Sequence, residues 1–427
     1  MKLKKLLLRY FPPGIILEYQ RTNGESEVKS LDLLNLSSDT DVAALVEEIL
    51  SEEPLIPLSK KHYLVSMIQR LKQKMSQNQN QKFELANQLK GHEQPLTNCA
   101  FDKYGKRFIT GSHDRTCKLF DSESGQELYN LEGHTNSVYC LAFNNPYSTK
   151  IATGSFDKTA RIWDAESGDC LKILKGHSEE IVCLGFESQG HFLATGSMDC
   201  TAKLWDLETG KTTLNLSGHK EEVISISFSS EGDRLITGSF DKTAKVWDLR
   251  TGILYYLIKI KGKCILTMDE HTQEISNALF DFTGELAATS SLDHSVKLWD
   301  LGSGKIIQSF NQHKDEVLDI MFNSTGTSLA SCSADATARI YSVSEGTNIG
   351  VLSGHSKSVN KVVFNPQGNK ILTASEDSTA KLWNLKGQEL QTLSGHSDEI
   401  FSCAFNYEGD TIITGSKDNT CMLWKSQ

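Results

Sequence analysis

From residue 83 onward, the chain repeats short runs in which apolar and polar residues alternate, with turn residues between them. The run VYCLAF at 138–143 gives way to a polar turn, and the runs ATGSFD and TARIWD follow it. Alternation with a period of two over four to six residues is typical of half-buried strands. Four such runs recur in each stretch of about 42 residues, so the pattern predicts repeated four-stranded antiparallel sheets.

Residues 1–75 show no such repeat. The runs KLLLRYF, GIILEYQ and EVKSLDLLNL predict three short strands. Apolar residues at helical spacing over 42–49 predict one helix, and a second is expected to begin near Ser59. We therefore expect a small α+β head over 1–75, joined to the repeats by a linker at 76–82.

Four residue types recur at fixed places in the repeats. A His opens each repeat: His92, His134, His177, His219, His271, His313, His355 and His396. An Asp follows each His by 22 or 23 residues: Asp114, Asp157, Asp199, Asp241, Asp293, Asp335, Asp377 and Asp418. A hydroxyl residue stands four positions before each Asp: Thr110, Thr153, Thr195, Thr237, Thr289, Ser331, Thr373 and Thr414. An aromatic residue stands six positions after it: Phe120, Trp163, Trp205, Trp247, Trp299, Tyr341, Trp383 and Trp424.

These marks resemble those of the WD-repeat β-propellers, in which Trp, Ser or Thr, His and Asp form one buried hydrogen-bonded tetrad in each blade. The fold class expected is all-β: a single eight-bladed WD-repeat propeller over 83–427, with the head before it. Tetrads that contain Phe120 or Tyr341 lack the indole donor and are expected to be weaker. A Ser/His/Asp catalytic site is the alternative, but eight near-identical copies indicate a structural role, so we expect no enzyme.

The ends of the repeat region predict how the ring closes. The last repeat has only KSQ after Trp424, so it lacks a fourth strand, whereas a fourth-strand segment without a blade precedes His92. Pairing of 83–90 with 420–425 would complete the eighth blade and remove two exposed strand edges.

Two sets of residues predict a protein-binding surface on the top face, the end of the ring that carries the His and Asp turns. On four consecutive blades, the residue before the Asp is apolar: Phe156, Met198, Phe240 and Leu292. A carboxylate stands three residues after the His on four adjacent blades: Glu180, Glu222, Glu274 and Glu316. An apolar arc rimmed by carboxylates is typical of a docking surface. The alternative is that these side chains only pack the turns.

Composition and charge narrow the classes of partner. The 427 residues carry a net charge of −10, with 12 basic and 10 acidic residues over 1–82 and 32 and 44 over the remainder. An acidic ring argues against nucleic-acid binding and favours protein partners. The ten Cys show no CxxC spacing, so we expect no metal and no cofactor. No apolar run is long enough for a membrane span, and we expect a cytosolic monomer without a signal peptide.

Two local features allow other interpretations. Ten residues, Ile253–Gly262, lengthen the fifth step between His residues, and seven of them are apolar. This insert is either a partner-binding loop on the bottom face or a translated short intron. The box WDLR (Trp247, Asp248, Arg250) is similar to the WDxR box of cullin ubiquitin ligase receptors. A substrate receptor of that kind, or another cytosolic scaffold, is the alternative function.

The whole chain resembles one WD-repeat family, the dynein assembly factors. The similarity rests on the head sequences MKLKKLLLRYFPPGIILEY and DVAALVEEI and on the closing DEIFSCAFNYEGDTIITGSKDNTCMLW. The resemblance implies a non-enzymatic adaptor that links outer-arm dynein to the intraflagellar transport complex B for delivery into motile cilia. It implies a location in the cytoplasm, at the ciliary base and in the cilium or flagellum. The ten-residue insert departs from the family pattern.

Overall fold

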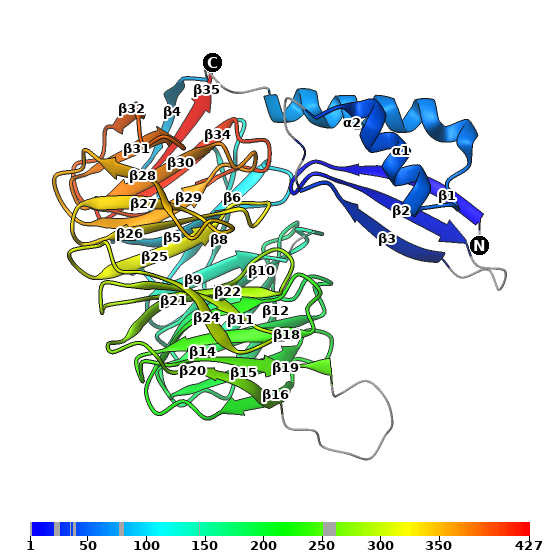
Figure 1. The fold of residues 1–427 in the computed structure, drawn as a ribbon. Coiled ribbons are helices and arrows are strands. Elements are labelled where there is room, and N and C mark those ends of the chain that lie inside the picture. Colours follow the sequence, from blue (N-terminus) through cyan, green and yellow to red (C-terminus); the bar gives the residue numbers. More distant parts are fainter. Residues whose placement is uncertain are drawn as a thin grey trace, which may run out of the picture. The chain divides into compact units, whose positions relative to one another are not determined.

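The computed structural model describes residues 2–20, 26–34, 36, 40–76, 81–144, 146–250 and 262–427 (Figure 1). The chain divides into two compact units: the first comprises Met1–Gln81 and Pro366–Gly368, and the second comprises Lys82–Asn365 and Asn369–Gln427. Of the predicted linker, residues 77–80 lie outside the described residues, as do all residues of the insert except Gly262.

The first unit is a three-stranded antiparallel sheet with two helices. Its strands lie in the order β1 (Lys2–Arg9), β2 (Gly14–Gln20) and β3 (Ser26–Asp32). The helices are α1 (Val42–Glu52) and α2 (Lys61–Ser76), with a 3-10 turn, η1 (Leu58–Lys60), before α2. The carboxylate of Asp41 caps α1 by accepting the N–H of Ala43 at 2.9 Å.

The core of this unit follows from the two periodicities. Alternate residues of β2 point to one side of the sheet, and residues three or four apart in the helices share a face. These positions form one buried cluster that includes Ile15, Leu17, Tyr19, Val46, Ile49, Leu64, Ile68 and Leu71. Because α2 runs through Ser76, the predicted boundary at residue 75 falls one residue before the helix ends.

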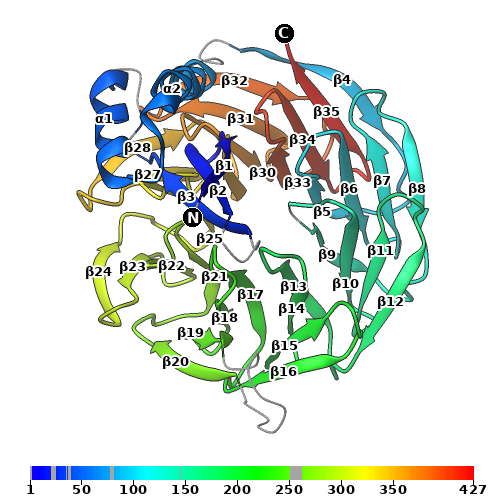
Figure 2. The same cartoon turned by 90° about the vertical axis from the view of Figure 1, so that its right-hand side faces the viewer.

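The second unit is a ring of eight four-stranded antiparallel sheets (Figure 2). Blades 1 and 2 consist of β5 (Leu96–Phe101), β6 (Arg107–Ser112), β7 (Cys117–Asp121), β8 (Glu127–Leu131), β9 (Val138–Phe143), β10 (Lys150–Ser155), β11 (Thr159–Asp164) and β12 (Cys170–Lys175). Blades 3 and 4 consist of β13 (Ile181–Phe186), β14 (Phe192–Ser197), β15 (Thr201–Asp206), β16 (Thr212–Ser217), β17 (Val223–Phe228), β18 (Arg234–Ser239), β19 (Ala244–Asp248) and β20 (Lys263–Met268).

Blades 5 and 6 consist of β21 (Ile275–Phe280), β22 (Leu286–Ser291), β23 (Val296–Asp300), β24 (Lys305–Phe310), β25 (Val317–Phe322), β26 (Ser328–Ser333), β27 (Thr337–Ser342) and β28 (Asn348–Ser353). Blades 7 and 8 consist of β29 (Val359–Phe364), β30 (Lys370–Ser375), β31 (Thr379–Asn384), β32 (Glu389–Ser394), β33 (Ile400–Phe405), β34 (Thr411–Ser416), β35 (Cys421–Ser426) and β4 (Phe83–Leu89). In Figure 2 the first strand of each blade lies nearest the middle of the ring.

The hydrophobic core of the ring lies between neighbouring blades. One cluster joins Cys140, Ala160 and Ile162 of blade 2 to Ile181 and Trp205 of blade 3, all of them buried. Both faces of the second and third strands are therefore covered, which explains why their runs are almost continuously apolar or small.

A strand from the other end of the repeat region completes blade 8. The antiparallel register pairs Cys421 with Leu89, Leu423 with Asn87, and Trp424 with Leu85. Phe83 is buried at the end of this strand, with its ring 6.2 Å from that of Phe405 in an edge-to-face arrangement. The predicted class, an eight-bladed propeller with a small α+β unit before it, is confirmed.

Candidate protein-interaction surface

Six of the eight blades carry a hydrogen-bonded series of four side chains at the top end. In blade 3, the indole Nε1 of Trp205 donates to Thr195 Oγ1 at 2.8 Å, and Thr195 Oγ1 lies 2.8 Å from His177 Nε2. The other ring nitrogen, His177 Nδ1, lies 2.7 Å from Asp199 Oδ2.

Counting donors and acceptors shows which atom carries each proton in this tetrad. An indole only donates and an ionised carboxylate only accepts. The hydroxyl of Thr195 accepts from Trp205, so its own proton goes to Nε2 of His177, and Nδ1 then donates to Asp199. Every group is satisfied when the imidazole is neutral and the carboxylate is charged, which is an arrangement for stability rather than for proton transfer.

The geometry recurs in all eight blades. The His–Asp distance lies between 2.7 and 2.9 Å, and the distance from His Nε2 to the hydroxyl oxygen between 2.7 and 2.8 Å. The predicted members of the second and fourth blades are joined in the same way: His134, Thr153, Asp157 and Trp163, and His219, Thr237, Asp241 and Trp247. Eight equivalent copies mark a frame, not a single catalytic centre.

The tetrad carboxylates also organise the turns around them. Asp199 accepts the backbone N–H groups of Ser178 and Thr201 and the hydroxyl of Thr201 at 2.6 Å. Burial opposes ionisation of Asp199, but the hydrogen bonds from His177 and Thr201 outweigh it and lower its pKa. Each Asp thereby fixes the two loops that form the top face.

Blades 1 and 6 depart from the tetrad, as their sequences predict. Phe120 offers no donor to Thr110 and stacks on Phe108, with ring centroids 5.2 Å apart. In blade 6, the hydroxyls of Ser331 and Tyr341 lie 3.4 Å apart, so the phenol partly replaces the indole.

We expect Phe120→Trp alone to destabilise the ring by about 1–3 kcal/mol, because the larger ring has to displace Phe108. In blades 3 and 4 the residue paired with the Trp is a leucine, Leu193 or Leu235. The double variant Phe108→Leu, Phe120→Trp therefore regains stability and adds the bond to Thr110, worth roughly 0.5–1.5 kcal/mol. Urea unfolding of the two single variants and the double variant measures this coupling. Additive effects would contradict it.

The backbone brings the two sets of predicted surface residues together. On each of blades 2 to 6, the N–H of the residue before the Asp donates to the carbonyl oxygen of the residue three after the His, at 2.9–3.0 Å. Met198 is joined to Glu180, Phe240 to Glu222 and Leu292 to Glu274 in this way. The fourth carboxylate, Glu316, is paired with Ala334 of blade 6, and Phe156 of blade 2 with Ser137. The two sets therefore overlap on blades 3 to 5.

The apolar residues of this arc are only partly covered. Met198 is exposed, whereas Phe156, Phe240 and Leu292 are half-buried. Phe156 stacks on Tyr139 of the same blade at 5.1 Å, and Tyr139 is itself 43% exposed. Tyr139 thus extends the arc. The sequence-based prediction did not include Tyr139, because it lies in an inner strand. The signal that could have found it is that no other blade has a tyrosine at this place in the repeat.

The four carboxylates of the rim have no charged partner among the residues that the structure describes. Glu180, Glu222, Glu274 and Glu316 make no side-chain hydrogen bond or ion pair with any part of the chain that the structure describes. In blade 8 the equivalent Glu399 is paired with Lys417 at 3.1 Å. The acidic rim is therefore confined to blades 3 to 6.

The remaining candidates are placed as follows. Trp247 belongs to its tetrad, and Arg250 of the WDLR box lies against Asp248 at 3.2 Å and Asp233 at 3.5 Å. Within the described ranges, no three His, Cys, Asp or Glu residues are grouped in a way that could hold a metal ion. Among the residues placed by the structure, no helix is long and apolar enough to cross a membrane.

Six complete tetrads, two modified ones in blades 1 and 6, eight four-stranded blades and the closing strand define a WD-repeat propeller. The family model for the WD domain, G-beta repeat, matches residues 83–121, 125–164, 168–206, 210–248, 262–300, 304–342, 346–384 and 387–425. The chain belongs to this family. The crystal structure of the computationally designed Ika8 protein is similar, with a TM-score of 0.69 and 27% identity over 79% of this chain and 98% of that one.

More specific relatives share the predicted resemblance. The human protein named Dynein assembly factor with WD repeat domains 1 is 58% identical over 147 residues, 34% of this chain and 35% of the human one. The Danio rerio protein of the same name is 51% identical over the same shares. The match thus spans about a third of the length of these curated relatives. The resemblance to this family is confirmed over this third of the chain.

Proposed function

We propose that this protein is a non-enzymatic adaptor in dynein assembly, which links outer-arm dynein to intraflagellar transport complex B for delivery into motile cilia. The observation that carries the proposal is the identity of 51–58% to proteins named as dynein assembly factors. The structure of the ring supports the adaptor proposal. Its repeated polar groups hydrogen-bond to one another, so the side chains that remain for binding lie mainly at the surface.

Affinity capture of the full chain from ciliated cells tests the proposal. We expect subunits of the outer dynein arm and of the transport complex among the captured proteins, identified by mass spectrometry. Capture of cullin-ligase components in their place would favour the substrate-receptor function, and Arg250→Ala would then abolish that association. Capture of neither dynein nor transport subunits would overturn the adaptor function.

The arc on the top face is the docking surface that we assign to one of these partners. Its half-buried apolar groups and four unneutralised carboxylates fit a segment that presents apolar side chains flanked by Lys or Arg. Because the tetrads hold both loops of each blade, the surface is preorganised, which lowers the entropic cost of binding.

The double variant Phe156→Ser, Phe240→Ser is expected to reduce dynein capture at least tenfold. Each aromatic group that a partner covers contributes roughly 1.5–3 kcal/mol, so losing two exceeds one tenfold step in affinity. Ala334→Ser, at the same position in blade 6, is the matched control and leaves capture unchanged. Undiminished capture by the double variant, with its thermal unfolding intact, would show that the arc does not bind dynein.

A further inference from the structure

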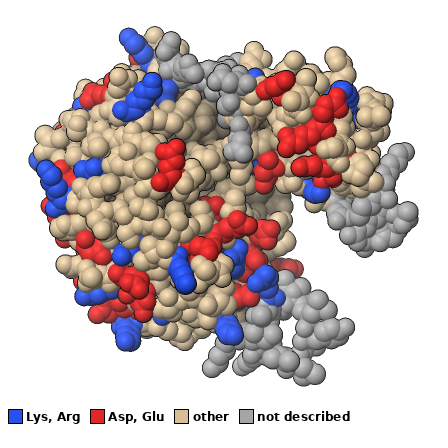
Figure 3. All heavy atoms as spheres, viewed as in Figure 1, with Lys and Arg blue, Asp and Glu red and all other residues tan. Residues whose placement is uncertain are grey.

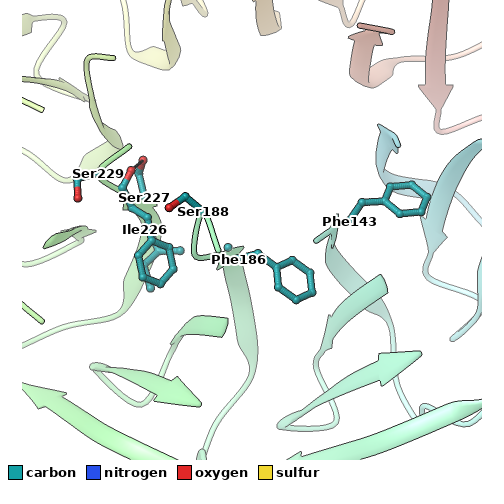
Figure 4. Close-up of a pocket in the computed structure, with 8 residues that line it drawn as sticks. Phe143, Phe186, Ser188, Ile226, Ser227 and Ser229 are labelled. Atoms are coloured by element: carbon teal, nitrogen blue, oxygen red, sulfur yellow. Dashed lines mark hydrogen bonds between the residues drawn. The ribbon is translucent and has the colours of Figure 1, made fainter. Parts of the chain in front are cut away.

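At the bottom face, the end of the ring opposite the tetrads, the inner strands leave a recess (Figure 4). It has a volume of about 380 Å³ and is lined by Phe143 of blade 2, Phe186 and Ser188 of blade 3, and Ile226 and Phe228 of blade 4. Figure 4 shows Phe143, Phe186 and Ile226 on neighbouring inner strands, with the side chain of Ser188 on the turn that follows β13.

A glycine opens this recess. At the next-to-last position of the inner strand, blades 1, 2 and 8 carry Ala and blades 5 to 7 carry Leu279, Met321 and Val363, whereas blade 3 carries Gly185. A side chain placed there would meet only Ile226 and Phe228, at 3.9 Å from its Cβ. Gly185 therefore leaves room for a side chain that comes from outside the chain.

The chemistry of the recess indicates what enters it. The recess is open to solvent and is lined by Ser188, Ser227 and Ser229 as well as by apolar side chains, and its volume is sufficient for an indole or a phenyl ring. Three Phe side chains line it, and aromatic pairs gain roughly 0.5–1.5 kcal/mol beyond the burial of area.

Acidic groups lie on the same blade, further from the ring centre. β15 ends at Asp206 and runs parallel to β13, so Asp206 and Glu208 lie at the same end of blade 3 as the recess. Burial opposes ionisation of Asp206, but the backbone N–H of Glu208 and the hydroxyl of Thr209 donate to its carboxylate, outweigh the effect of burial and lower its pKa. Neither carboxylate forms an ion pair with a residue in the described part of the chain. Figure 3 shows groups of acidic side chains over the middle and lower part of the ring.

The spacing of the strands indicates how far apart the two contacting side chains of a partner segment would lie. Two strand separations of about 4.8 Å place the carboxylates about 10 Å outward from the recess. An extended peptide covers that distance in about three residues, at roughly 3.3 Å each. We propose that the bottom face of blade 3 binds an extended segment of a partner protein, with an aromatic side chain in the recess and a Lys or Arg about three residues away on Asp206 and Glu208.

A phage-displayed library of random twelve-residue peptides, panned on the full chain, tests this proposal although the partner is unidentified. Peptides enriched on the wild type over Gly185→Leu, which fills the recess, are expected to carry an aromatic residue with Lys or Arg two to four positions away. If no peptide distinguishes the two proteins, the proposal is wrong, whatever the outcome for dynein.

Binding of a selected peptide, measured by fluorescence anisotropy, separates the two contacts. Gly185→Leu and Ser188→Arg are expected to weaken binding at least tenfold, since one fills the recess and the other places a cation at its opening. Glu208→Lys weakens it three- to tenfold, with a smaller effect at high salt because of screening. Ala404→Leu, at the same position in blade 8, is the matched control. Should Ser188→Arg, whose side chain lies outside the packed core, bind as the wild type does, the recess is not the site.

Discussion

A chain that begins at Lys82 is expected to keep a folded ring, whereas one that begins at Lys90 is expected to lose it. The two differ by eight residues, and only the shorter chain lacks β4, the strand that completes blade 8. Six residue pairs join β4 to β35. Both the N–H and the carbonyl of Phe83 are also bonded to the side chain of Gln391.

The expected loss is a large part of the stability of the ring. Exposure of Phe83 costs roughly 1.5–3 kcal/mol, and each lost ladder hydrogen bond roughly 0.5–1.5 kcal/mol, against about 5–15 kcal/mol for a typical folded protein. Loss of β4 also leaves β35 as a free edge, which invites association with other chains. Thermal unfolding by circular dichroism and size-exclusion chromatography measure both effects.

The chain that begins at Lys82 is the control for removal of the first unit, because it retains every blade residue. If the chain from Lys90 unfolds at the same temperature as the chain from Lys82, ring closure by β4 does not stabilise the propeller. A melt in which only a minor fraction of the signal is lost would place the damage in blade 8 alone.

Most of the ring could be predicted because its signals are repeated. The spacing of His, Ser or Thr, Asp and aromatic residues reveals both the strands and the tetrads, since each hydrogen bond needs its partner at a fixed place. Closure was predictable from the fourth-strand segment before His92 that has no blade of its own. The same comparison of repeats predicted the weak tetrad of Phe120, although not its stacking on Phe108, because that contact depends on packing.

The surfaces were less predictable, since exposure depends on neighbours that a pattern does not reveal. The arc was expected from Phe156 and Phe240, but the stacking of Tyr139 on Phe156 requires the geometry of blade 2. The recess at Gly185 was missed for the same reason. Its only sequence signal is a glycine where the neighbouring blade 2 has Ala142, and a single small residue does not predict a cavity.

Asp377→Asn is expected to destabilise the ring by about 2–4 kcal/mol at neutral pH. The carboxylate of Asp377 accepts four donors, namely His355 Nδ1, the N–H of Ser356, and the N–H and hydroxyl of Thr379. An amide replaces one accepting oxygen by an NH₂ group, so buried donors lose their partner. Asp300→Asn is the matched control, because Asp300 accepts similar turn bonds from Gly302 and Ser303, and these bonds are exposed to solvent. Its effect stays within about 0.5 kcal/mol in urea unfolding.

The pH dependence of the difference in stability between the wild type and Asp377→Asn identifies the cause of that difference. Burial opposes ionisation of Asp377, but the bonds from Thr379, Ser356 and His355 outweigh it and lower its pKa from 3.8 to about 2. A lowered carboxyl pKa stabilises the fold above 3.8, and that stabilisation is lost as the pH falls from 3.8 towards 2. The gap between wild type and Asp377→Asn should therefore narrow over this window. Burial also lowers the pKa of His355 and His396 from 6.5, so the fold weakens as the pH falls below 6.5. Because Asp377 opposes this lowering at His355, the variant weakens more than the wild type, and the gap widens below 6.5 before it narrows below 3.8. A gap that stays constant down to pH 3 would mean that the charge of Asp377 contributes nothing and that only the shape of its side chain matters.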